Sequence, residues 1–349
     1  MKNKIIATLA TFGMVASASA VKINDNISIN GFIDSSYNNY DETIGGVQEE
    51  TTNTGIDEVE LNFLVNAGNV SGELHIDNNG DASSSLDIEQ VHFTYNFDNG
   101  AFVTVGKFGS TLGLEREDPA GLFTYSRAYG SFNSSRTGAG VLGNNKGLVY
   151  NLGDVDGAYV GEGVRFGYAA GDFSASLALF NDVGVLEEGP NLGNLGAVAG
   201  ENDYDYELSV SYTGIENLSV TAGVMNVSEI DSKPSNVNDG VDSDIYSVNA
   251  AYTLNKLLIA GEYTSIEVDG ADDLSAYLLL LDYDINDKLG VALRYSEWET
   301  GAATESDKIT FAPNYAITDS LGAIVEFSAE EASGGDEEDS IAIELTYTF

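Results

Sequence analysis

Cysteine is absent from this chain of 349 residues, and proline, histidine and the basic residues are scarce. Without cysteine, no disulfide can hold the fold together. Lysine and arginine together number 14 against 56 aspartates and glutamates, which gives a formal net charge of -42. So acidic a chain is unsuited to binding nucleic acid, because its surface repels phosphate.

Long hydrophobic runs are also missing beyond the first twenty residues. A transmembrane helix needs a run of about 18 or more apolar residues, so the sequence predicts none. A chain of this kind can cross a membrane only as a closed β-barrel, because only helices and closed barrels satisfy every backbone polar group in lipid. At this stage a soluble β protein remains equally open.

The first twenty residues have the composition of a secretory signal peptide. Lys2 and Lys4 supply the charged start, residues 5–15 the apolar segment, and Ala18-Ser19-Ala20 a cleavage site of small residues. We therefore expect a signal peptide at residues 1–20 and one mature domain at residues 21–349.

The dominant pattern of the mature chain is an alternation of apolar and polar side chains in segments of about ten residues. Residues 203–212 and 340–349 show it most clearly. Alternate side chains of a strand point to opposite faces, so each segment is a ribbon with one apolar and one polar side. Sixteen strands can be counted, at residues 27–38, 55–66, 69–78, 86–97, 101–107, 160–170, 172–181, 203–213, 217–227, 243–253, 256–266, 274–285, 288–299, 306–316, 319–330 and 339–349.

Two kinds of connection join these strands. Very short turns such as Gly171-Asp172 alternate with longer acidic connections at residues 39–54, 182–202, 228–242 and 331–338. Short turns at one end, long loops at the other and an even strand number are typical of membrane barrels. The sequence therefore predicts an all-β, transmembrane, antiparallel up-and-down β-barrel of about 16 strands. A soluble sandwich or propeller also buries one face of each strand, but it does not explain the loop asymmetry.

Two strands depart from simple alternation. The fourth changes phase between Ile88 and Val91, which predicts a β-bulge or a rim outside the lipid. Residues 276–281 are apolar on both faces, so Leu278 and Leu280 are expected to face the lumen or an underlying contact.

Three segments carry a resemblance to a known family: ISINGFIDSSYN, VGKFGSTLGLEREDPAGLFTYSRAY and the C-terminal Tyr347-Thr348-Phe349. With them the chain resembles the Gram-negative porins, and within these the OmpL-like β-barrel porin family. The matching features are a Gly-Lys-Phe strand end, a Gly-x-Glu segment, and a Tyr-Ser-Arg after an acidic-Pro step. The resemblance implies an outer-membrane location and a final aromatic residue, Phe349, that the barrel-assembly machinery reads.

The basic residues gather around the segment between the fifth and sixth predicted strands, where six of the 14 lie between Lys107 and Arg165. General porins place an inward-folded loop at this position, so the resemblance implies that residues 108–159 fold into the lumen and narrow it. Opposed charges at such a constriction select ions. We expect the constriction to be formed by Arg116, Arg127, Arg136, Glu115, Glu117, Asp118 and Arg165. The alternative is that these arginines only attach the loop to the wall by salt bridges.

The polar faces of the strands should form an acidic inner wall. Arg165 and Arg294 are the only basic residues expected on these faces. The lumen should therefore concentrate cations and show a mild cation preference. The predicted wall residues are Glu58, Glu60, Glu73, Asp77, Asp205, Glu207, Glu262, Arg294, Glu326 and Glu344.

Other chemistry has little support in the sequence. His75 and His92 take inward parity on neighbouring strands, but no third residue is spaced to complete a metal site. Neither histidine falls in a catalytic pattern, so we expect no enzyme activity, no cofactor and no metal. Aromatic side chains near strand ends on the apolar face are expected to form membrane girdles: Tyr37, Tyr168, Tyr204, Tyr212, Tyr252, Tyr283, Tyr295, Tyr347 and Phe349.

Together these features predict a passive diffusion channel of the bacterial outer membrane for small hydrophilic solutes and ions. Its expected partners are outer-membrane lipid and lipopolysaccharide, the barrel-assembly machinery and the solutes, but no nucleic acid. General porins are trimers, so the resemblance implies a homotrimer. The alternative is a plugged barrel that acts as a structural or adhesive surface protein, with acidic loops that bind divalent cations.

Overall fold

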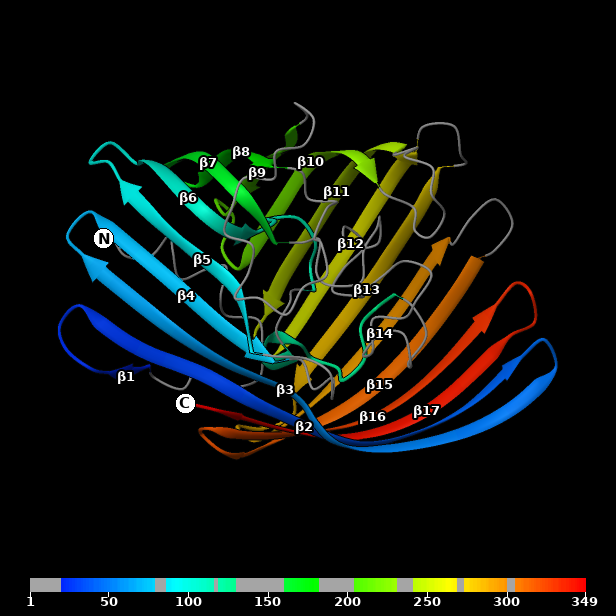
Figure 1. Ribbon diagram of the computed structural model, residues 1–349. Helices are drawn as coiled ribbons and strands as arrows, with labels where there is room; N and C mark the ends of the chain where they lie inside the picture. The colour runs from blue at the N-terminus through cyan, green and yellow to red at the C-terminus, as the bar shows by residue number, and fades with distance from the viewer. Residues whose placement is uncertain are drawn as a thin grey trace.

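Within the described residues, sixteen antiparallel strands pair in sequence order, and the last pairs with the first to close a barrel (Figure 1). This computed structural model describes residues 20–78, 86–115, 119–129, 160–181, 204–230, 241–268, 273–299 and 305–349. The barrel strands are β2 (Ile27–Ile44), β3 (Val47–Ala67), β4 (Val70–Asn78), β5 (Asp87–Asn96), β6 (Ala101–Gly109), β7 (Val160–Ala170), β8 (Phe173–Asn181), β9 (Tyr204–Tyr212), β10 (Leu218–Ile230), β11 (Val241–Leu254), β12 (Leu257–Val268), β13 (Leu274–Asp284), β14 (Leu289–Glu299), β15 (Glu305–Thr318), β16 (Leu321–Ala332) and β17 (Glu337–Thr348). A two-residue strand, β1 (Val21–Lys22), pairs with the start of β2.

The predicted fold class and strand number are confirmed by this arrangement. Strand existence was readable because alternation is a local signal with a period of two residues. Among the residues that the structure describes, no helix is both long and apolar enough to cross a membrane. The expected signal peptide lies almost entirely outside the described residues, so it stays a prediction.

The prediction of long loops is wrong for two of the connections. Strand β2 continues to Ile44 and β3 begins at Val47, so residues 39–54 form an extended hairpin rather than a loop. Its turn is Gly45-Gly46, with φ of 58° and 81°, which glycine adopts without strain. Residues 331–338 likewise contain the ends of β16 and β17 around a short turn. Both stretches are polar on both faces, so backbone pairing continues where the side-chain pattern has no signal.

Residues 182–202, the first of the other two expected loops, lie outside the described part of the chain. The second expected loop, residues 228–242, is described only at its ends, where β10 extends to Ile230 and β11 begins at Val241.

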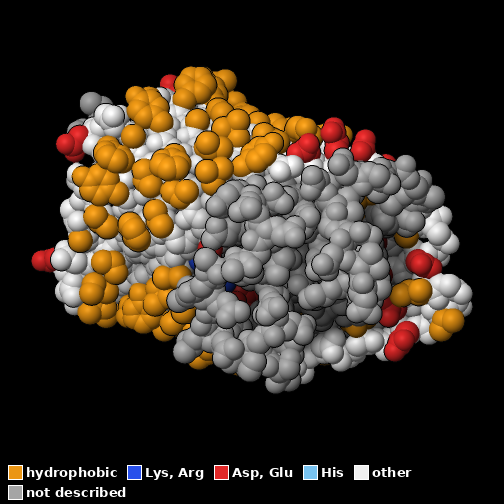
Figure 2. All heavy atoms as spheres, turned by 45° about the horizontal axis from the view of Figure 1, so that its top comes forward, with side chains coloured by type: hydrophobic (Ala, Val, Ile, Leu, Met, Phe, Trp, Pro, Cys, Tyr) orange, Lys and Arg blue, Asp and Glu red, His pale blue; other side chains and the backbone are white. Residues whose placement is uncertain are grey.

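The outer surface of the barrel is apolar and the inner surface is largely polar. In β17, the outward-facing Ile343 and Leu345 are exposed, whereas the inward-facing Glu344 is buried. Figure 2 shows a broad hydrophobic area over the outer wall, with acidic side chains at its margins. Six of the predicted girdle tyrosines are exposed: Tyr37, Tyr168, Tyr252, Tyr283, Tyr295 and Tyr347.

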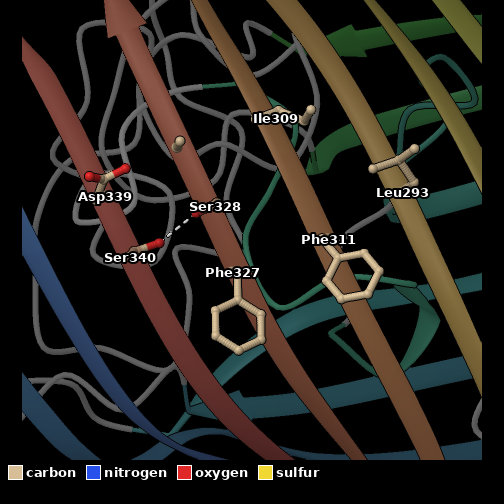
Figure 3. Close-up of a pocket in the computed structure, with 8 residues that line it drawn as sticks. Leu293, Ile309, Phe311, Phe327, Ser328, Asp339 and Ser340 are labelled. Atoms are coloured by element: carbon tan, nitrogen blue, oxygen red, sulfur yellow. Dashed lines mark hydrogen bonds between the residues drawn. The ribbon is translucent and has the colours of Figure 1, made fainter.

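A shallow groove lies on this outer face over β14 to β17. Leu293, Phe311 and Phe327 line it, and the two phenylalanine rings stack with their centroids 6.5 Å apart (Figure 3). Such a surface is stable only against hydrocarbon or another apolar surface, because it would otherwise expose contiguous hydrophobic area to water.

The interior is not uniformly polar, because a hydrophobic cluster covers part of the inner wall. Leu278 and Leu280 belong to it and are buried, which confirms their predicted inward orientation. Trp298 of β14 packs edge-on against Tyr129, with the ring centroids 6.2 Å apart. This cluster surrounds the inward-folded segment that follows β6.

The predicted β-bulge in the fourth barrel strand, β5, is confirmed. His75 pairs with Gln90 and Ile76 with Ile88, so Glu89 is an extra residue between two paired positions. A bulge of this kind turns two consecutive side chains toward one face. Glu89 is accordingly buried, and the amide oxygen of Gln90 accepts a hydrogen bond from the Gly109 N–H at 3.3 Å.

Barrel closure includes the last residue of the chain. The N–H of Phe349 donates to the Gly31 carbonyl, and the Gly31 N–H donates to the Phe349 carbonyl, both at 3.1 Å. Gly31 has no room for a side chain, because a Cβ there would lie 2.2 Å from the Glu60 carbonyl oxygen.

Candidate functional site in the barrel interior

The described part of the segment after β6 folds into the barrel. The predicted loop begins two residues later than expected, since Phe108 and Gly109 still belong to β6. Residues 110–115 and 119–129 follow, with a short 3-10 turn at Pro119–Gly121. Gly113 has a φ of 86°, which lets the chain turn sharply there. Most side chains of this segment are buried against the wall.

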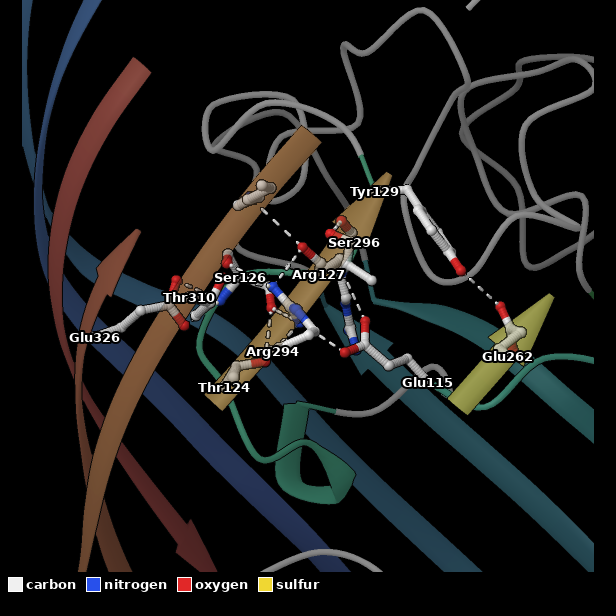
Figure 4. Close-up of polar contacts among 12 residues, drawn as sticks. Glu115, Thr124, Ser126, Arg127, Tyr129, Glu262, Arg294, Ser296, Thr310 and Glu326 are labelled. Carbon is white, nitrogen blue, oxygen red and sulfur yellow. Dashed lines mark hydrogen bonds and ion pairs between the residues drawn. The ribbon is translucent and has the colours of Figure 1, made fainter. Parts of the chain in front are cut away.

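Arg294 of β14 is the centre of the contacts between wall and segment (Figure 4). Its side chain is fully buried. One terminal nitrogen donates to Glu115 Oε1 at 2.6 Å, to Thr124 Oγ1 at 2.7 Å and to the Ser126 carbonyl at 2.8 Å. The other donates to the Arg127 carbonyl at 2.8 Å and to Ser126 Oγ at 3.1 Å. The planar guanidinium therefore fixes several turns of the segment at once.

Two wall carboxylates hold the beginning of the segment. Glu207 of β9 accepts a hydrogen bond from the Ser110 hydroxyl, and also from the Thr111 N–H at 3.1 Å and its hydroxyl at 2.7 Å. Glu262 of β12 accepts from the Leu114 N–H and from the Tyr129 hydroxyl at 3.2 Å. Charge-assisted bonds of this type are about twice as strong as neutral ones.

Three further wall residues hold the second half of the segment. Glu326 of β16 accepts from the Ser126 N–H at 3.1 Å, and the Ser296 hydroxyl donates to the Ala128 carbonyl. Lys308 of β15 is buried, with its Nζ 3.5 Å from the Arg127 carbonyl. Strands β9, β12, β14, β15 and β16 thus all contribute to holding the segment.

Arg165 of β7 lies at the base of the segment. Its Nη2 donates to the Gly109 carbonyl at 2.7 Å and lies 3.6 Å from Glu207 Oε1. The guanidinium carbon also sits 4.5 Å from the centre of the Phe108 ring, a cation–π contact. Arg165 therefore fixes the point where the chain leaves the wall.

Tyr129 is buried where the segment meets the apolar cluster. Burial raises the pKa of its phenol well above the usual range, and the nearby carboxylates of Glu262 and Glu115 raise it further. The phenol is therefore protonated at any physiological pH and donates its hydrogen to Glu262.

The acidic part of the wall lies on β2 to β5 and β17. Glu58, Glu60 and Asp77 are buried on the inner face of β3 and β4, and Glu344 is buried on β17. Glu73 shares this face but keeps 42% of its side chain exposed. Asp205, on β9, is also buried. The ten predicted wall residues therefore all occupy inner positions, but Glu207, Glu262, Arg294 and Glu326 contact the segment directly.

Of the predicted constriction residues that belong to the segment, the structure describes only Glu115 and Arg127, and both are buried. Glu115 is buried and bonded to Arg294 and to the Ala128 N–H, the latter at 2.7 Å. Arg127 is buried, and its carbonyl accepts from the wall. In this ion pair the segment supplies the acid, Glu115, and the wall supplies the base, Arg294. Four predicted residues lie outside the described part of the chain: Arg116, Glu117, Asp118 and Arg136.

Sequence reasoning missed several inner residues. Lys308 shares the parity of Thr310 on β15, so the expectation that Arg165 and Arg294 are the only inward bases is wrong. Asp34 is buried on β2 and accepts from the Thr346 hydroxyl at 3.1 Å. Strand parity could have found both. Parity could not have found Glu89, because its orientation depends on the bulge.

The expectation that His75 and His92 do not form a metal site stays a prediction. The sequence spacing gave no sign, however, of the two carboxylates that lie close to His75. Donor atoms of Glu60, His75 and Glu89 all lie within 4.8 Å of one another. These residues come from three neighbouring strands, and their relation was hidden until the register of β3, β4 and β5 was known.

Comparisons with known proteins agree with this architecture. The model of the Gram-negative porin family matches residues 7–348. An anion-selective porin from Comamonas acidovorans is similar in structure, with a TM-score of 0.65 and 13% identity over 93% of this chain and 99% of that one. OmpF of Salmonella typhi in complex with daunomycin has a TM-score of 0.62 and 14% identity over 95% of this chain and 100% of that one.

A third solved structure is OmpT of Vibrio cholerae in a trimer form. It has a TM-score of 0.59 and 14% identity, and the match covers 93% of this chain and 100% of that one. At these identities the structural likeness shows a shared fold alone. No curated protein sequence matches the chain.

Proposed function

Since this chain belongs to the Gram-negative porin family and forms a channel of the bacterial outer membrane, we propose that small hydrophilic solutes and ions diffuse passively through it, with a mild preference for cations. Diffusion of this kind requires no reaction, which agrees with a non-enzymatic family. The narrower likeness to the OmpL-like porins remains a prediction.

The acidic inner wall is the observation that carries the cation preference. Asp34, Glu58, Glu60 and Asp77 are buried on the inner faces of β2 to β4, and Glu344 adjoins them on β17. A surface of one sign in a confined, low-dielectric passage raises the local concentration of counter-ions. Four carboxylates on three neighbouring strands therefore attract cations and oppose anions.

The inward segment supplies the steric part of the mechanism. Arg294, Glu207 and Glu262 hold residues 110–115 and 119–129 inside the barrel. Tyr125 of the same segment also contacts Ser36 and Asn38 of β2, at 3.0 Å each. A segment held by many buried hydrogen bonds is rigid, so it narrows the passage by a fixed amount and excludes large solutes. Selection by size then belongs to this segment, and selection by charge to the acidic inner wall.

Reversal potentials across a planar bilayer in a KCl gradient test the proposal. The wild type is expected to give stable conductance steps and a potential of the sign for cation preference. A Glu58→Gln, Glu60→Gln double variant should reduce the preference. The matched control is Asp172→Asn, Asp319→Asn, which removes the same charge from exposed short turns and should leave the potential unchanged.

Two results would contradict the proposal. Clear anion preference of the wild type would show that the acidic wall does not set selectivity. Complete absence of steps would favour the plugged structural or adhesive barrel instead. Liposome swelling with sugars of graded size then distinguishes an open channel from a plugged one without relying on ions.

We also propose that three copies of the chain assemble into a homotrimer. Support comes from the trimer form of the structurally similar OmpT and from the exposed apolar groove over β14 to β17. Light scattering coupled to gel filtration in detergent measures the protein mass directly. A protein mass of one chain at all concentrations would exclude the trimer.

A further inference from the structure

Glu60, His75 and Glu89 bring three potential metal ligands together on the inner wall. They lie on β3, β4 and β5, which are consecutive neighbours in the barrel (Figure 1). His75 Nδ1 lies 3.1 Å from Glu60 Oε1 and 4.0 Å from Glu89 Oε2. One donor atom from each residue lies within 4.8 Å of the other two. Two ligand atoms at bond lengths of about 2.0–2.2 Å from one cation are at most about 4.4 Å apart. The distances from His75 Nδ1 to the two carboxylate oxygens lie within that limit.

The strand register explains how the three residues meet. Asn62 pairs with His75, and Glu60 lies two positions before Asn62 on β3, on the same inner face. On β5 the bulge inserts Glu89 beside Gln90, the residue that pairs with His75. Without that extra residue, alternation would turn position 89 away from the interior. The bulge therefore directs the third ligand toward the imidazole, as bulges near functional sites commonly do.

Glu73 completes the environment of the imidazole from the other side. Its Oε2 lies 3.2 Å from His75 Nε2, the ring nitrogen that does not face Glu60 and Glu89. In a neutral His75 ring with the proton on Nε2, this carboxylate accepts the hydrogen bond and Nδ1 is a lone-pair donor. Metal-bound histidines nearly always have such a partner, which orients the ring and raises its basicity. This contact is independent of the three ligands and fits a metal-bound histidine.

We propose that Glu60, His75 and Glu89 form a binding site for a first-row divalent cation such as Zn²⁺. One imidazole nitrogen and two carboxylates suit Zn²⁺ and its neighbours, whereas Mg²⁺ and Ca²⁺ prefer oxygen ligands throughout. Three protein ligands leave a fourth position for water. Because the ligands belong to the inner wall, a bound cation would lie among the acidic residues beside the passage.

A second explanation of the same contacts involves no metal. A protonated His75 would form ion pairs with Glu60 and Glu73 and would hold the strands together by itself. The two explanations differ in what happens to added Zn²⁺, because a cation that needs Nδ1 must displace the proton. Binding of Zn²⁺ therefore separates them.

The test is isothermal titration calorimetry of the full chain, refolded in detergent and freed of metal with a chelator. Zn²⁺ is titrated in a large excess of Mg²⁺, which saturates the many exposed carboxylates. The wild type is expected to bind one Zn²⁺ per chain under these conditions. His75→Gln and Glu89→Gln should each weaken binding by about tenfold or more.

His92→Gln is the matched control. His92 lies on the same inner face, and its Nε2 is 3.9 Å from Glu73 Oε2, but it is not part of the ligand set. The His92→Gln variant should bind Zn²⁺ with the same affinity as the wild type. A change in gel mobility on heating shows whether each variant is folded. If His75→Gln does not fold, Glu89→Gln tests the ligand set in its place.

X-ray absorption at the zinc edge provides a second readout. The bound ion should show a histidine nitrogen together with oxygen ligands. The proposal is overturned if the wild type binds no Zn²⁺ in excess Mg²⁺, if His75→Gln binds it as tightly as the wild type, or if the spectrum contains only oxygen ligands. None of these outcomes depends on whether the barrel conducts.

Discussion

At the scale of single residues, Arg294 illustrates how a charge on the wall becomes a structural anchor. Its guanidinium reaches Glu115, Thr124 and Ser126, which belong to a segment far away in sequence. Full burial makes each of these bonds stronger than it would be in water and makes the loss of one partner costly. The buried charge is compensated by Glu115, so neither residue is free to act on passing ions by itself.

Arg294→Gln should therefore loosen the segment. Removing one partner of a buried ion pair costs about 3–5 kcal/mol, because the other charge is left uncompensated. Lower resistance to urea is expected, followed through the fluorescence of Trp298, which is the single tryptophan and packs on Tyr129. Conductance steps should become larger and noisier.

The double variant Arg294→Gln, Glu115→Gln should recover part of this stability, since no unpaired charge remains. Lys256→Gln, on an exposed turn, is the control for loss of a positive charge. If the single variant matches the wild type in both urea resistance and conductance, Arg294 does not anchor the segment.

At the scale of elements, closure depends on the close approach of β2 to its neighbours. The backbone of Gly31 exchanges two hydrogen bonds with Phe349, and its Cα faces the Glu60 carbonyl. A Cβ at this position would have no space, because it would also lie 3.0 Å from the Phe349 ring. The same strand continues far beyond the expected end, because pairing with β3 and β17 persists through polar residues.

Gly31→Ala should impair closure of the barrel. The new Cβ would meet the Glu60 carbonyl oxygen at 2.2 Å, so β2 and β3 must separate locally. Gly322→Ala is the control, since nothing lies within 4 Å of a Cβ at that strand position. The folded fraction after refolding, measured by heat-dependent gel mobility, should fall for the first variant only. Equal folding of both would contradict the steric argument.

Phe349→Ala separates the roles of the last residue. The substitution keeps the two backbone bonds to Gly31, so refolding in detergent should be normal. In cells, the amount of protein in the outer membrane should fall if the assembly machinery reads the aromatic ring. Tyr347→Ala removes another outward-facing aromatic residue and is the control. Equal membrane levels of both variants would argue against recognition of Phe349.

At the scale of the whole molecule, charge and apolar area are segregated. Hydrophobic side chains cover the outer wall, and acidic side chains face the interior and the margins (Figure 2). The acidic residues that the structure describes therefore act on the passage and on the solvent-facing ends rather than on the lipid. The effect of this charge on ions should depend on how strongly dissolved salt screens it.

Cation preference should decline as salt increases. The Debye length falls from about 10 Å at 0.1 M to about 3 Å at 1 M, so the acidic wall acts over a shorter range. Reversal potentials at a constant KCl ratio, but at rising mean concentration, measure this decline. A preference that is independent of salt would indicate selection by direct binding rather than by the field of the wall.

The sequence alone determined the class of the fold, because alternation and turn length are local properties. Sixteen strands and the inward orientation of Leu278 could be read from neighbouring residues. A change of phase between Ile88 and Val91 likewise predicted a bulge or a rim, and the structure has the bulge. Parity likewise placed Glu60 and Glu344 on the inner face before any contact was known.

Only the tertiary structure decided which of these residues meet. Glu115 and Arg294 are 179 positions apart, and no periodic pattern relates them. Glu60, His75 and Glu89 approach one another because of the register of three strands and one extra residue. Strand β2 likewise extends to Ile44 because its partners continue, a property that its own polar side chains do not encode. Contacts across a closed barrel depend on register and on what the interior encloses, and neither is a local property of the chain.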